Sequence, residues 1–413
     1  MHSSFAAASA LALSTVLAAP AVAQQQVRPP IAHYWMSVET AAGMAGMGGM
    51  GAMMGRMMGA PGMESGKRMV LQLGSSQAAA GAPRAQHDVP PALGMGPMLP
   101  LLTPQAARPE RAPRDLPEGM ERPRGRMLIF WGCGETARPG QPVVIDFAKV
   151  AQGQMPAGLS ARRVAAGSPP APGRSRTYGD WPNREDSRPV PEAASLRGDH
   201  VVKGTYSPEI RFALGERHDF MAQVELAPAQ PTPGGAMKVQ WRAVPNATGY
   251  FATAMGGNER EEVVFWSSAE VQEMGGALMD YVPPAEVARL IREKVVMAPQ
   301  TTECTVPAEV IKAAQAPFFN FIAYGDELNL VHPPRPADTK QAWEQQWAVK
   351  VRLKSTAAAL LAEGMGDEAR APRRGRGEPQ SPGPQAPPQQ GEAPAPGSPV
   401  DEGARILRGI LKF

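Results

Sequence analysis

The sequence predicts a mainly β protein with two β-sandwich-like domains and long disordered segments. Short runs rich in β-branched and aromatic residues recur along most of the chain, which is typical of strands. Proline and glycine number 45 and 43 among 413 residues, and both interrupt helices and weaken strand interiors. We therefore expect strand-bearing islands separated by long loops.

Charge and hydropathy exclude two classes of protein. The chain holds 42 Lys and Arg against 39 Asp and Glu residues, a formal net charge of +3. Nucleic acids require a dense basic patch, so no nucleic-acid partner is expected. Beyond residue 23 no stretch reaches the length of about eighteen apolar residues that a membrane helix needs, so we expect no transmembrane span in the mature chain.

Residues 1–23 are predicted to be a signal peptide. The apolar run 5–19 has the length of a signal-peptide core, and Ala21 and Ala23 supply the small residues that signal peptidase requires. The segment before the run holds His2 but no Lys or Arg, which departs from the usual pattern. A buried N-terminal helix is the alternative, and the polar sequence that follows disfavours it. Export to a periplasmic or extracellular compartment is expected.

Residues 24–222 are expected to form a first, insertion-rich β domain. Its predicted strands are residues 31–39, 67–75, 126–134, 141–149, 201–214 and 219–227. The last of these strands runs past the domain boundary. The insertions between them are a Met/Gly-rich loop at 42–63 and Pro/Arg-rich loops at 76–125 and 151–198.

Cys133 and Cys304 are the only cysteines of the chain. In an oxidising compartment such a pair is more often bonded than free, and both cysteines lie in segments with the character of ordered structure. The sequence therefore predicts a Cys133–Cys304 disulfide between two distant parts of the chain. Two buried free thiols are the alternative, since distance cannot be read from sequence.

One segment of the second half, residues 237–255, carries a specific pattern. Its positions are Trp241, Val244, Pro245, Ala247, Gly249 and Tyr250. Val239 and Trp241 alternate on one face of a strand, and Pro245 with Asn246 makes a turn. The pattern resembles the second and third strands of a fibronectin type III module. This resemblance implies a β-sandwich at about residues 223–358 that binds or spaces rather than catalyses.

Further elements are expected around this segment. Strands at 261–268, 318–325 and 347–355 would complete the sandwich, with Tyr324 as a corner tyrosine. A helical insertion begins at Pro283 and Pro284, and a second short helix is expected at 307–315. The apolar stripe of the first helix is expected to pack on the sheet; it consists of Val287, Leu290, Ile291 and Val295.

A second resemblance is weaker. The segments 131–135 and 323–336 carry it: together with the pattern above, they make the chain similar to exported alphaproteobacterial proteins to which no activity is assigned. This resemblance implies no site.

No catalytic motif is evident. The sequence lacks HExxH, CxxC, GxSxG and P-loop patterns. Residues 46–51 match GxGxxG, but glycines and Pro61 prevent the helix that a dinucleotide loop needs, so we attribute the match to chance. His87, His200 and His218, each beside an aspartate, are interpreted as members of surface polar pairs, because adjacent strand side chains point to opposite faces. We therefore assign no catalytic residue and no cofactor.

Methionines dominate the loop 42–63. They include Met44, Met47, Met50, Met53, Met54, Met57 and Met58. Seven glycines between residues 43 and 59 exclude a stable helix. A loop without a metal role is the favoured interpretation. The alternatives are a sticky apolar surface and capture of Cu(I) by the soft thioether sulfurs of these methionines.

The C-terminal part has two predicted segments. Residues 359–403, rich in Pro, Gly and Gln, are expected to be a disordered linker, and residues 404–413 to be a basic amphipathic segment. In a helical conformation Ile406, Leu407, Ile410 and Leu411 would share one face, with Arg405, Arg408 and Lys412 opposite and Phe413 at the end. Contact with an anionic membrane surface or a partner groove is the hypothesis, and packing on the protein's own β domain is the alternative.

The pattern as a whole indicates an exported, non-catalytic envelope binding or interaction protein, with an unidentified envelope protein or surface as partner. A hydrolase with a site between the domains is the second hypothesis, and Cu(I) handling is the third. A deep polar cleft with converging titratable groups would favour the enzyme, and flat sheets would favour the binding module.

Overall fold

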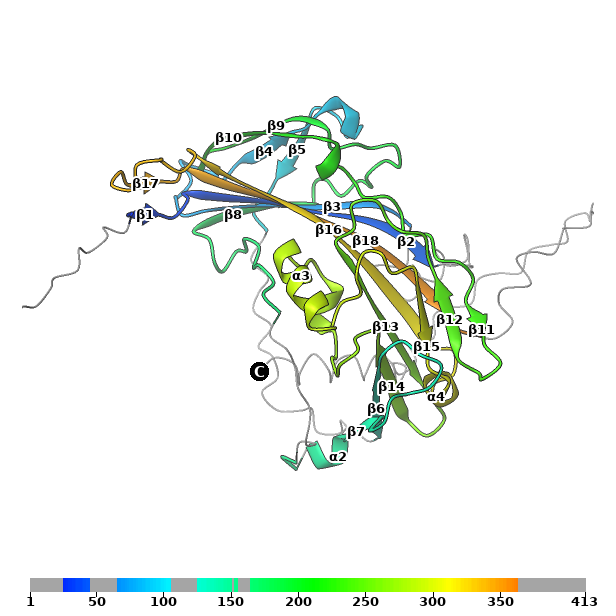
Figure 1. The fold of residues 1–413 in the computed structure, drawn as a ribbon. Helices are drawn as coiled ribbons and strands as arrows, with labels where there is room; N and C mark the ends of the chain where they lie inside the picture. Colours follow the sequence, from blue (N-terminus) through cyan, green and yellow to red (C-terminus); the bar gives the residue numbers. More distant parts are fainter. Residues whose placement is uncertain (1–24, 45–64, 105–124, 151, 155–163, 363–413) are drawn as a thin grey trace, which may run out of the picture.

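A computed structural model describes residues 25–44, 65–104, 125–150, 152–154 and 164–362 (Figure 1). The predicted signal peptide, residues 45–63 of the Met/Gly-rich loop and everything after residue 362 lie outside this part. Strands dominate the described residues, so the expected mainly β fold is confirmed.

A nine-stranded sheet is the centre of the fold. In spatial order it contains β7 (Val143–Asp146), β6 (Arg126–Trp131), β14 (Glu262–Ser267), β13 (Gly249–Gly257), β16 (Phe318–His332), β18 (Trp347–Leu360), β2 (Ala32–Met44), β3 (Gly66–Ser75) and β8 (Thr177–Trp181). Two junctions are parallel, β6 with β14 and β18 with β2, and the others are antiparallel. Each parallel junction joins a strand from before residue 222 to one after it. The expected boundary at 222 and 223 therefore does not separate two sheets.

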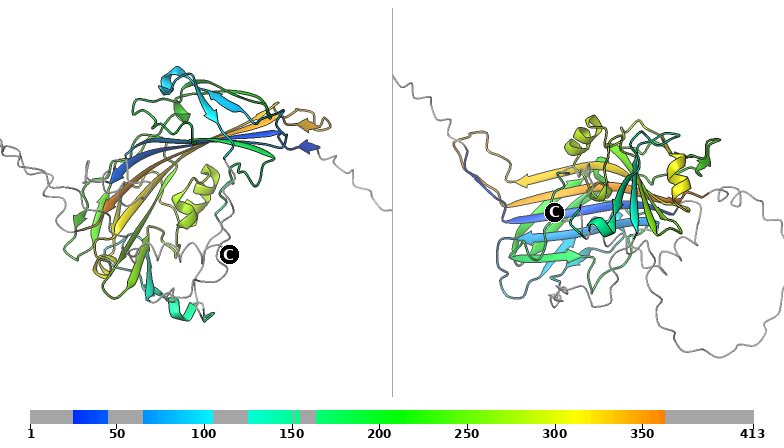
Figure 2. Two further views of the ribbon diagram at one scale, coloured as in Figure 1. Left: turned by 180° about the vertical axis from the view of Figure 1, so that it is seen from behind. Right: turned by 90° about the horizontal axis from the view of Figure 1, so that it is seen from below.

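Smaller sheets pack against the central one (Figures 1 and 2). A four-stranded sheet contains β10 (Ser207–Leu214), β9 (Gly198–Gly204), β4 (Ala85–Asp88) and β5 (Met98–Leu101), and a three-stranded sheet contains β11 (Gln230–Pro231), β12 (Met237–Gln240) and β15 (Glu303–Val306). β1 (Val27–Arg28) pairs with β17 (Trp343–Glu344). Buried side chains of the four-stranded, three-stranded and nine-stranded sheets form one core cluster, so the two smaller sheets share a face of the large sheet.

The opposite face of the nine-stranded sheet carries α3 (Pro284–Arg292), as Figure 2 shows. Alternation along β16 sends Phe319 and Phe321 into the core under the smaller sheets, and Ile322 and Tyr324 into a second cluster with the helix. The expected apolar stripe is confirmed: Val287, Leu290 and Val295 are buried in that cluster, and Ile291 packs against it. The other short helices among the described residues are η1 (Pro91–Leu93), α2 (Phe147–Val150), η2 (Glu216–His218), η3 (Gly276–Met279) and α4 (Ala308–Ala313).

Several elements differ from the sequence predictions. The predicted strand at 219–227 is wrong, because its residues form only an isolated bridge between Leu226 and Trp241 as the chain passes from one small sheet to the other. The predicted strand at 201–214 is a hairpin of β9 and β10. Three further strands, β4, β5 and β8, lie inside the segments expected as loops at 76–125 and 151–198. Each of the three has five residues or fewer. β4 pairs with β9 and β8 with β3, which are distant in sequence, whereas β5 pairs with the nearby β4.

Tyr324 does not form the expected corner. Its hydroxyl donates a hydrogen bond of 2.5 Å to the carbonyl oxygen of Leu278, which lies 46 residues earlier in η3. A tyrosine corner requires an acceptor a few residues upstream of the tyrosine. Tyr324 instead anchors the segment that leads into α3 to the central sheet.

Candidate functional site

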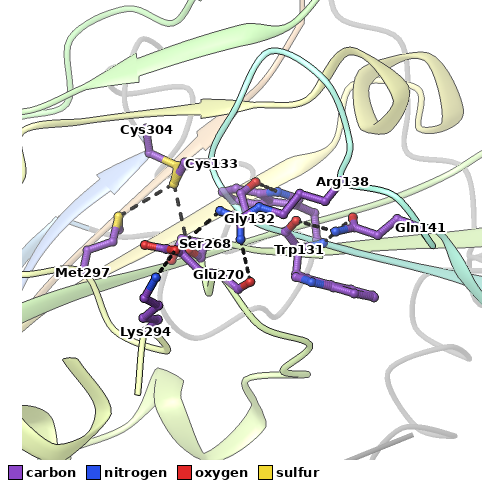
Figure 3. Close-up of polar contacts among 11 residues, drawn as sticks. Trp131, Gly132, Cys133, Arg138, Gln141, Ser268, Glu270, Lys294, Met297 and Cys304 are labelled. Atoms are coloured by element: carbon purple, nitrogen blue, oxygen red, sulfur yellow. Dashed lines mark hydrogen bonds and ion pairs between the residues drawn. A yellow bond between two sulfur atoms is a disulfide. The ribbon is translucent and has the colours of Figure 1, made fainter. Parts of the chain in front are cut away.

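Cys133 and Cys304 form a disulfide, as predicted (Figure 3). Their Cα atoms are 5.2 Å apart across a sequence separation of 171 residues. Cys133 follows β6 of the nine-stranded sheet, and Cys304 lies in β15 of the three-stranded sheet. The bond therefore cross-links these two sheets covalently.

The surroundings of the disulfide are structural. Backbone hydrogen bonds on both sides of Cys133, from Gly132 N to Ser267 O and from Gly134 N to Thr305 O, fix the chain between the two sheets. The Trp266 indole donates to the carbonyl oxygen of Gly132 at 2.9 Å. Arg138, whose guanidinium lies close to Gly132, forms an ion pair with Glu270 at the rim (Figure 3). With both sulfurs bonded to each other, this corner offers no thiolate for chemistry.

Most of the other predicted site residues lie outside the described part of the chain. Met47, Met50, Met53, Met54, Met57 and Met58 are among them, and so are residues 404–413. The backbone of Met44 is the last position of β2. Within the described ranges, no group of three or more His, Cys, Asp and Glu side chains is arranged to hold a metal ion.

A polar cleft of about 600 Å³ lies where segments of the first and second halves of the chain meet. Its lining consists of Glu216, Arg217, Asn246, Ala247, Thr248 and Asp326. An adjoining recess of about 280 Å³ shares four of these residues and extends the lining to Arg197, Asp219, Phe220, Met221, Ala222, Pro245 and Leu353. The cleft therefore joins η2, the turn between β12 and β13, and the middle of β16.

Backbone geometry positions the cleft. In the turn, Ala247 N donates to Val244 O, and Asn246 has a φ of 62°, a left-handed conformation that asparagine tolerates. The β16–β18 register shifts between Tyr324 and Glu327, which is the signature of a bulge and re-aims the side chain between them. Gly325 is required there, because a Cβ would lie 2.6 Å from the sulfur of Met221.

The two aspartates of the cleft are already compensated. Asp326 accepts a hydrogen bond of 2.6 Å from Arg217 Nε and lies 3.6 Å from His218 Nε2. Asp219 accepts from the Ser195 hydroxyl at 2.6 Å and from the backbone N–H groups of Leu196 and Phe220. Arg197 lies 3.5 Å from the Asp219 carboxylate. Asp219 therefore fixes the local backbone. Asp326 holds Arg217 in place, and the two side chains form one wall of the cleft.

Covalent hydrolysis would require a nucleophile beside a base. The Ser195 hydroxyl is committed to Asp219, while His218 faces Asp326. No described serine, threonine or cysteine donates a hydrogen bond to either ring nitrogen of His218. Asp326 of the cleft thus lies beside His218, which is not a lining residue, and this pair has no adjacent nucleophile among the described residues.

His87 and His200 are not surface residues, which corrects their interpretation from sequence. Both side chains are fully buried between the four-stranded and nine-stranded sheets. The Tyr34 hydroxyl lies 2.8 Å from His87 Nδ1, His87 Nε2 lies 2.9 Å from His200 Nδ1, and His200 Nε2 lies 2.7 Å from Leu196 O. One sequence signal pointed to this burial: His87 and His200 alternate with the buried Val89 and Val202.

Only one arrangement of protons satisfies this buried chain. The carbonyl of Leu196 can only accept, so His200 Nε2–H donates to it. With both rings neutral, His200 Nδ1 accepts from His87 Nε2–H and His87 Nδ1 accepts from the Tyr34 hydroxyl, so every donor has an acceptor. A proton added to either ring would leave one donor of these three side chains without an acceptor. Burial lowers the pKa of His87 and of His200 below 6.5, and for His87 the neighbouring imidazole adds to the effect.

Comparison with known proteins assigns no family. A scan against protein-family models found no match, and searches of curated proteins and of solved structures found none either. In the described part of the chain, no helix is long and apolar enough to cross a membrane.

Proposed function

We propose that this chain is an exported, non-catalytic binding protein of the cell envelope whose ligand occupies the polar cleft. The disulfide supports export, because such bonds persist in oxidising compartments. The predicted signal peptide supports it independently from the sequence.

The fibronectin type III-like interpretation belongs to the same proposal and is supported by strand pairing. The three strands β11, β12 and β15 form one sheet, and β14, β13, β16 and β18 are neighbours in the other, as in a two-sheet sandwich. Trp241 follows β12 and its ring lies 5.6 Å from that of Tyr250 in β13, across the two sheets. In this proposal the sandwich is embedded in a larger sheet that continues beyond β14 and β18.

The cleft is the observation that carries the proposal. In the cleft, the loop that joins β12 and β13 lies against residues of η2, which belongs to the first half of the chain. Loops that join sandwich strands are where such modules offer a binding surface. The aspartates of the cleft are paired with arginines, so the cleft presents a polar surface without a nucleophile–base pair among the described residues. A ligand that donates and accepts hydrogen bonds fits this lining better than an apolar one.

A capture experiment tests the proposal. The full-length protein is immobilised and incubated with solubilised envelope of its own host cell, beside an Ala247→Trp variant that fills the cleft. An Ala213→Trp variant is the matched control, because this alanine is exposed on the edge strand β10. We expect one component to be retained by the wild type and by Ala213→Trp, and lost with Ala247→Trp.

Two results would contradict the proposal. Equal retention by Ala247→Trp and the wild type would remove the cleft from binding. A change in mass of the retained component after incubation with the purified protein would instead support the hydrolase hypothesis.

A further inference from the structure

Three cations lie on the face of the nine-stranded sheet that faces away from the smaller sheets. Along β18 the buried residues Val349, Val351 and Leu353 belong to the core under the smaller sheets. Strand alternation therefore sends Lys350, Arg352 and Lys354 to the other face, where they follow one another at about 6.6 Å. This face is opposite the cleft, whose lining includes Leu353.

Two of these cations are neutralised by carboxylates. Lys350 forms a close ion pair with Glu327 on β16. Lys354 lies 3.5 Å from the Asp280 carboxylate and 4.0 Å from that of Glu39. Neither lysine needs a further anion.

Arg352 has a different environment. Its guanidinium carbon lies 4.3 Å from the ring centroid of Tyr281 and 5.1 Å from that of Trp35. Its Nε–H donates to the Ser37 hydroxyl on β2 at 2.7 Å. No carboxylate among the described residues lies within ion-pair distance of it, and its two terminal nitrogens have no protein acceptor there. Four N–H donors of a fixed guanidinium are thus left for a ligand.

The environment of Arg352 favours the binding of an anion. The side chain is half-buried, and this desolvation lowers its pKa, although Asp280, Tyr281 and Glu327 oppose the change. A guanidinium held by two rings and a hydroxyl has also lost most of its side-chain freedom. An oxyanion would therefore bind there with little further ordering and with charge-assisted hydrogen bonds.

We propose that Arg352 is the centre of a carboxylate-binding site on this face, with the acid accepting two parallel N–H···O bonds from the terminal nitrogens. Lys350 and Lys354 flank the site, and the rings of Trp35 and Tyr281 keep the guanidinium plane in place. The carboxylates of Glu39, Asp280 and Glu327 lie on this face, and Arg68 pairs with Glu39 in addition to the lysines of β18. A monoanionic carboxylate adds less negative charge beside these carboxylates than a phosphate dianion, and therefore fits this face better.

The experiment is a titration of the full-length protein followed by NMR. The reporters are the Trp35 indole N–H signal, assigned with a Trp35→Phe variant, and the Arg352 Nε–H signal. Sodium acetate and inorganic phosphate are added in parallel, and sodium chloride at matched ionic strength controls for screening. We expect saturable shifts with acetate, weaker shifts with phosphate and none beyond screening with chloride.

Substitutions distinguish the bidentate hydrogen-bonding geometry of Arg352 from its charge. Arg352→Lys keeps the cation but loses bidentate geometry, so acetate should bind at least about tenfold more weakly. Arg211→Lys is the matched control: this exposed arginine on β10 pairs with Glu209, and its replacement should leave binding unchanged.

Three results would overturn the inference. They are unsaturable acetate shifts in the wild type, acetate affinity retained in Arg352→Lys, and tighter binding of phosphate than of acetate. If Arg352→Lys fails to fold, the wild-type titrations still decide between these outcomes. Because the site lies on the opposite face from the cleft, failure here leaves the capture experiment with Ala247→Trp unaffected.

Discussion

The buried pair His87 and His200 illustrates how one side chain can determine the protonation state of the next. A carbonyl acceptor at Leu196 fixes the tautomer of His200, which fixes that of His87, which in turn orients the Tyr34 hydroxyl. Each donor meets one acceptor, so the network compensates the cost of burying three polar side chains. An additional proton would leave one donor of this hydrogen-bonded network without an acceptor.

The stability of the protein should therefore fall in mild acid. Above about pH 6.5 neither the folded nor the unfolded chain protonates these imidazoles, and stability is complete. Below that pH the unfolded chain binds protons that the folded chain excludes until its lowered pKa values are reached. Each histidine then decreases the free energy of unfolding by up to about 1.4 kcal/mol per pH unit. Urea unfolding from about pH 7.5 to about pH 5.5 measures this slope.

A double variant identifies the source of the slope. His87→Leu with His200→Leu should reduce the pH dependence, whatever its effect on absolute stability; burial also lowers the pKa of His33, which remains in the variant. His332→Gln is the control, because this exposed ring stacks on Trp347 outside the buried chain. An unchanged slope in the double variant would show that other groups cause the loss in acid.

At the scale of elements, α3 shows how a short helix is held by the sheet. Its nine residues are too few for stability in isolation, so packing must supply it. Leu290 is fully buried with Phe251, Ile322 and Tyr324 beneath the helix. Gly249 lets β13 approach closely, because a Cβ there would lie 2.9 Å from Val287 and from Val296.

Leu290→Ala should therefore destabilise the fold by about 2–5 kcal/mol, through lost burial and the cavity that remains. Chemical denaturation followed by tryptophan fluorescence measures the change. Arg292→Ala, an exposed position of the same helix, should change stability by less than about 0.5 kcal/mol. A loss for Leu290→Ala as small as that of the control would mean that α3 does not dock as described.

Element type was predictable where a segment carries its own signal. β6 and β14 hold several β-branched or aromatic residues in succession, and α3 is preceded by Pro283, begins with Pro284 and continues with an apolar stripe. β4 and β5 carry no such signal. In β8, Gly179 and Asp180 interrupt the strand-forming residues, and the pairing is supplied by β3. Such strands form because a partner edge is present, which local sequence does not reveal.

The candidate sites were less predictable than the fold. The disulfide followed from the number of cysteines, the predicted export and the ordered character of both cysteine segments. The cleft depends on a bulge at Gly325 and Asp326 and on the approach of η2, neither of which has a sequence signature. The alternation of Lys350, Arg352 and Lys354 is visible in sequence, but the rings beside them come from β2 and from the segment before α3.

At the scale of the whole molecule, the two halves of the chain share one sheet. Parallel pairing of β6 with β14 and of β18 with β2 places strands of the first half on both sides of four strands of the second half. The Cys133–Cys304 bond closes a loop of 171 residues, which stabilises the fold by about 5 kcal/mol in the chain-entropy model. We infer that residues 25–362 fold as one cooperative unit.

Separate expression of the two halves tests this central claim most directly. Residues 24–222 and 223–362 are purified apart and their thermal unfolding is followed by calorimetry and near-ultraviolet circular dichroism, with residues 24–362 as the reference. We expect a single cooperative transition for the reference and none for either half, because each half alone exposes the strand edges that the other covers. A cooperative transition in the isolated 223–362 fragment would contradict it and would restore an independent second domain.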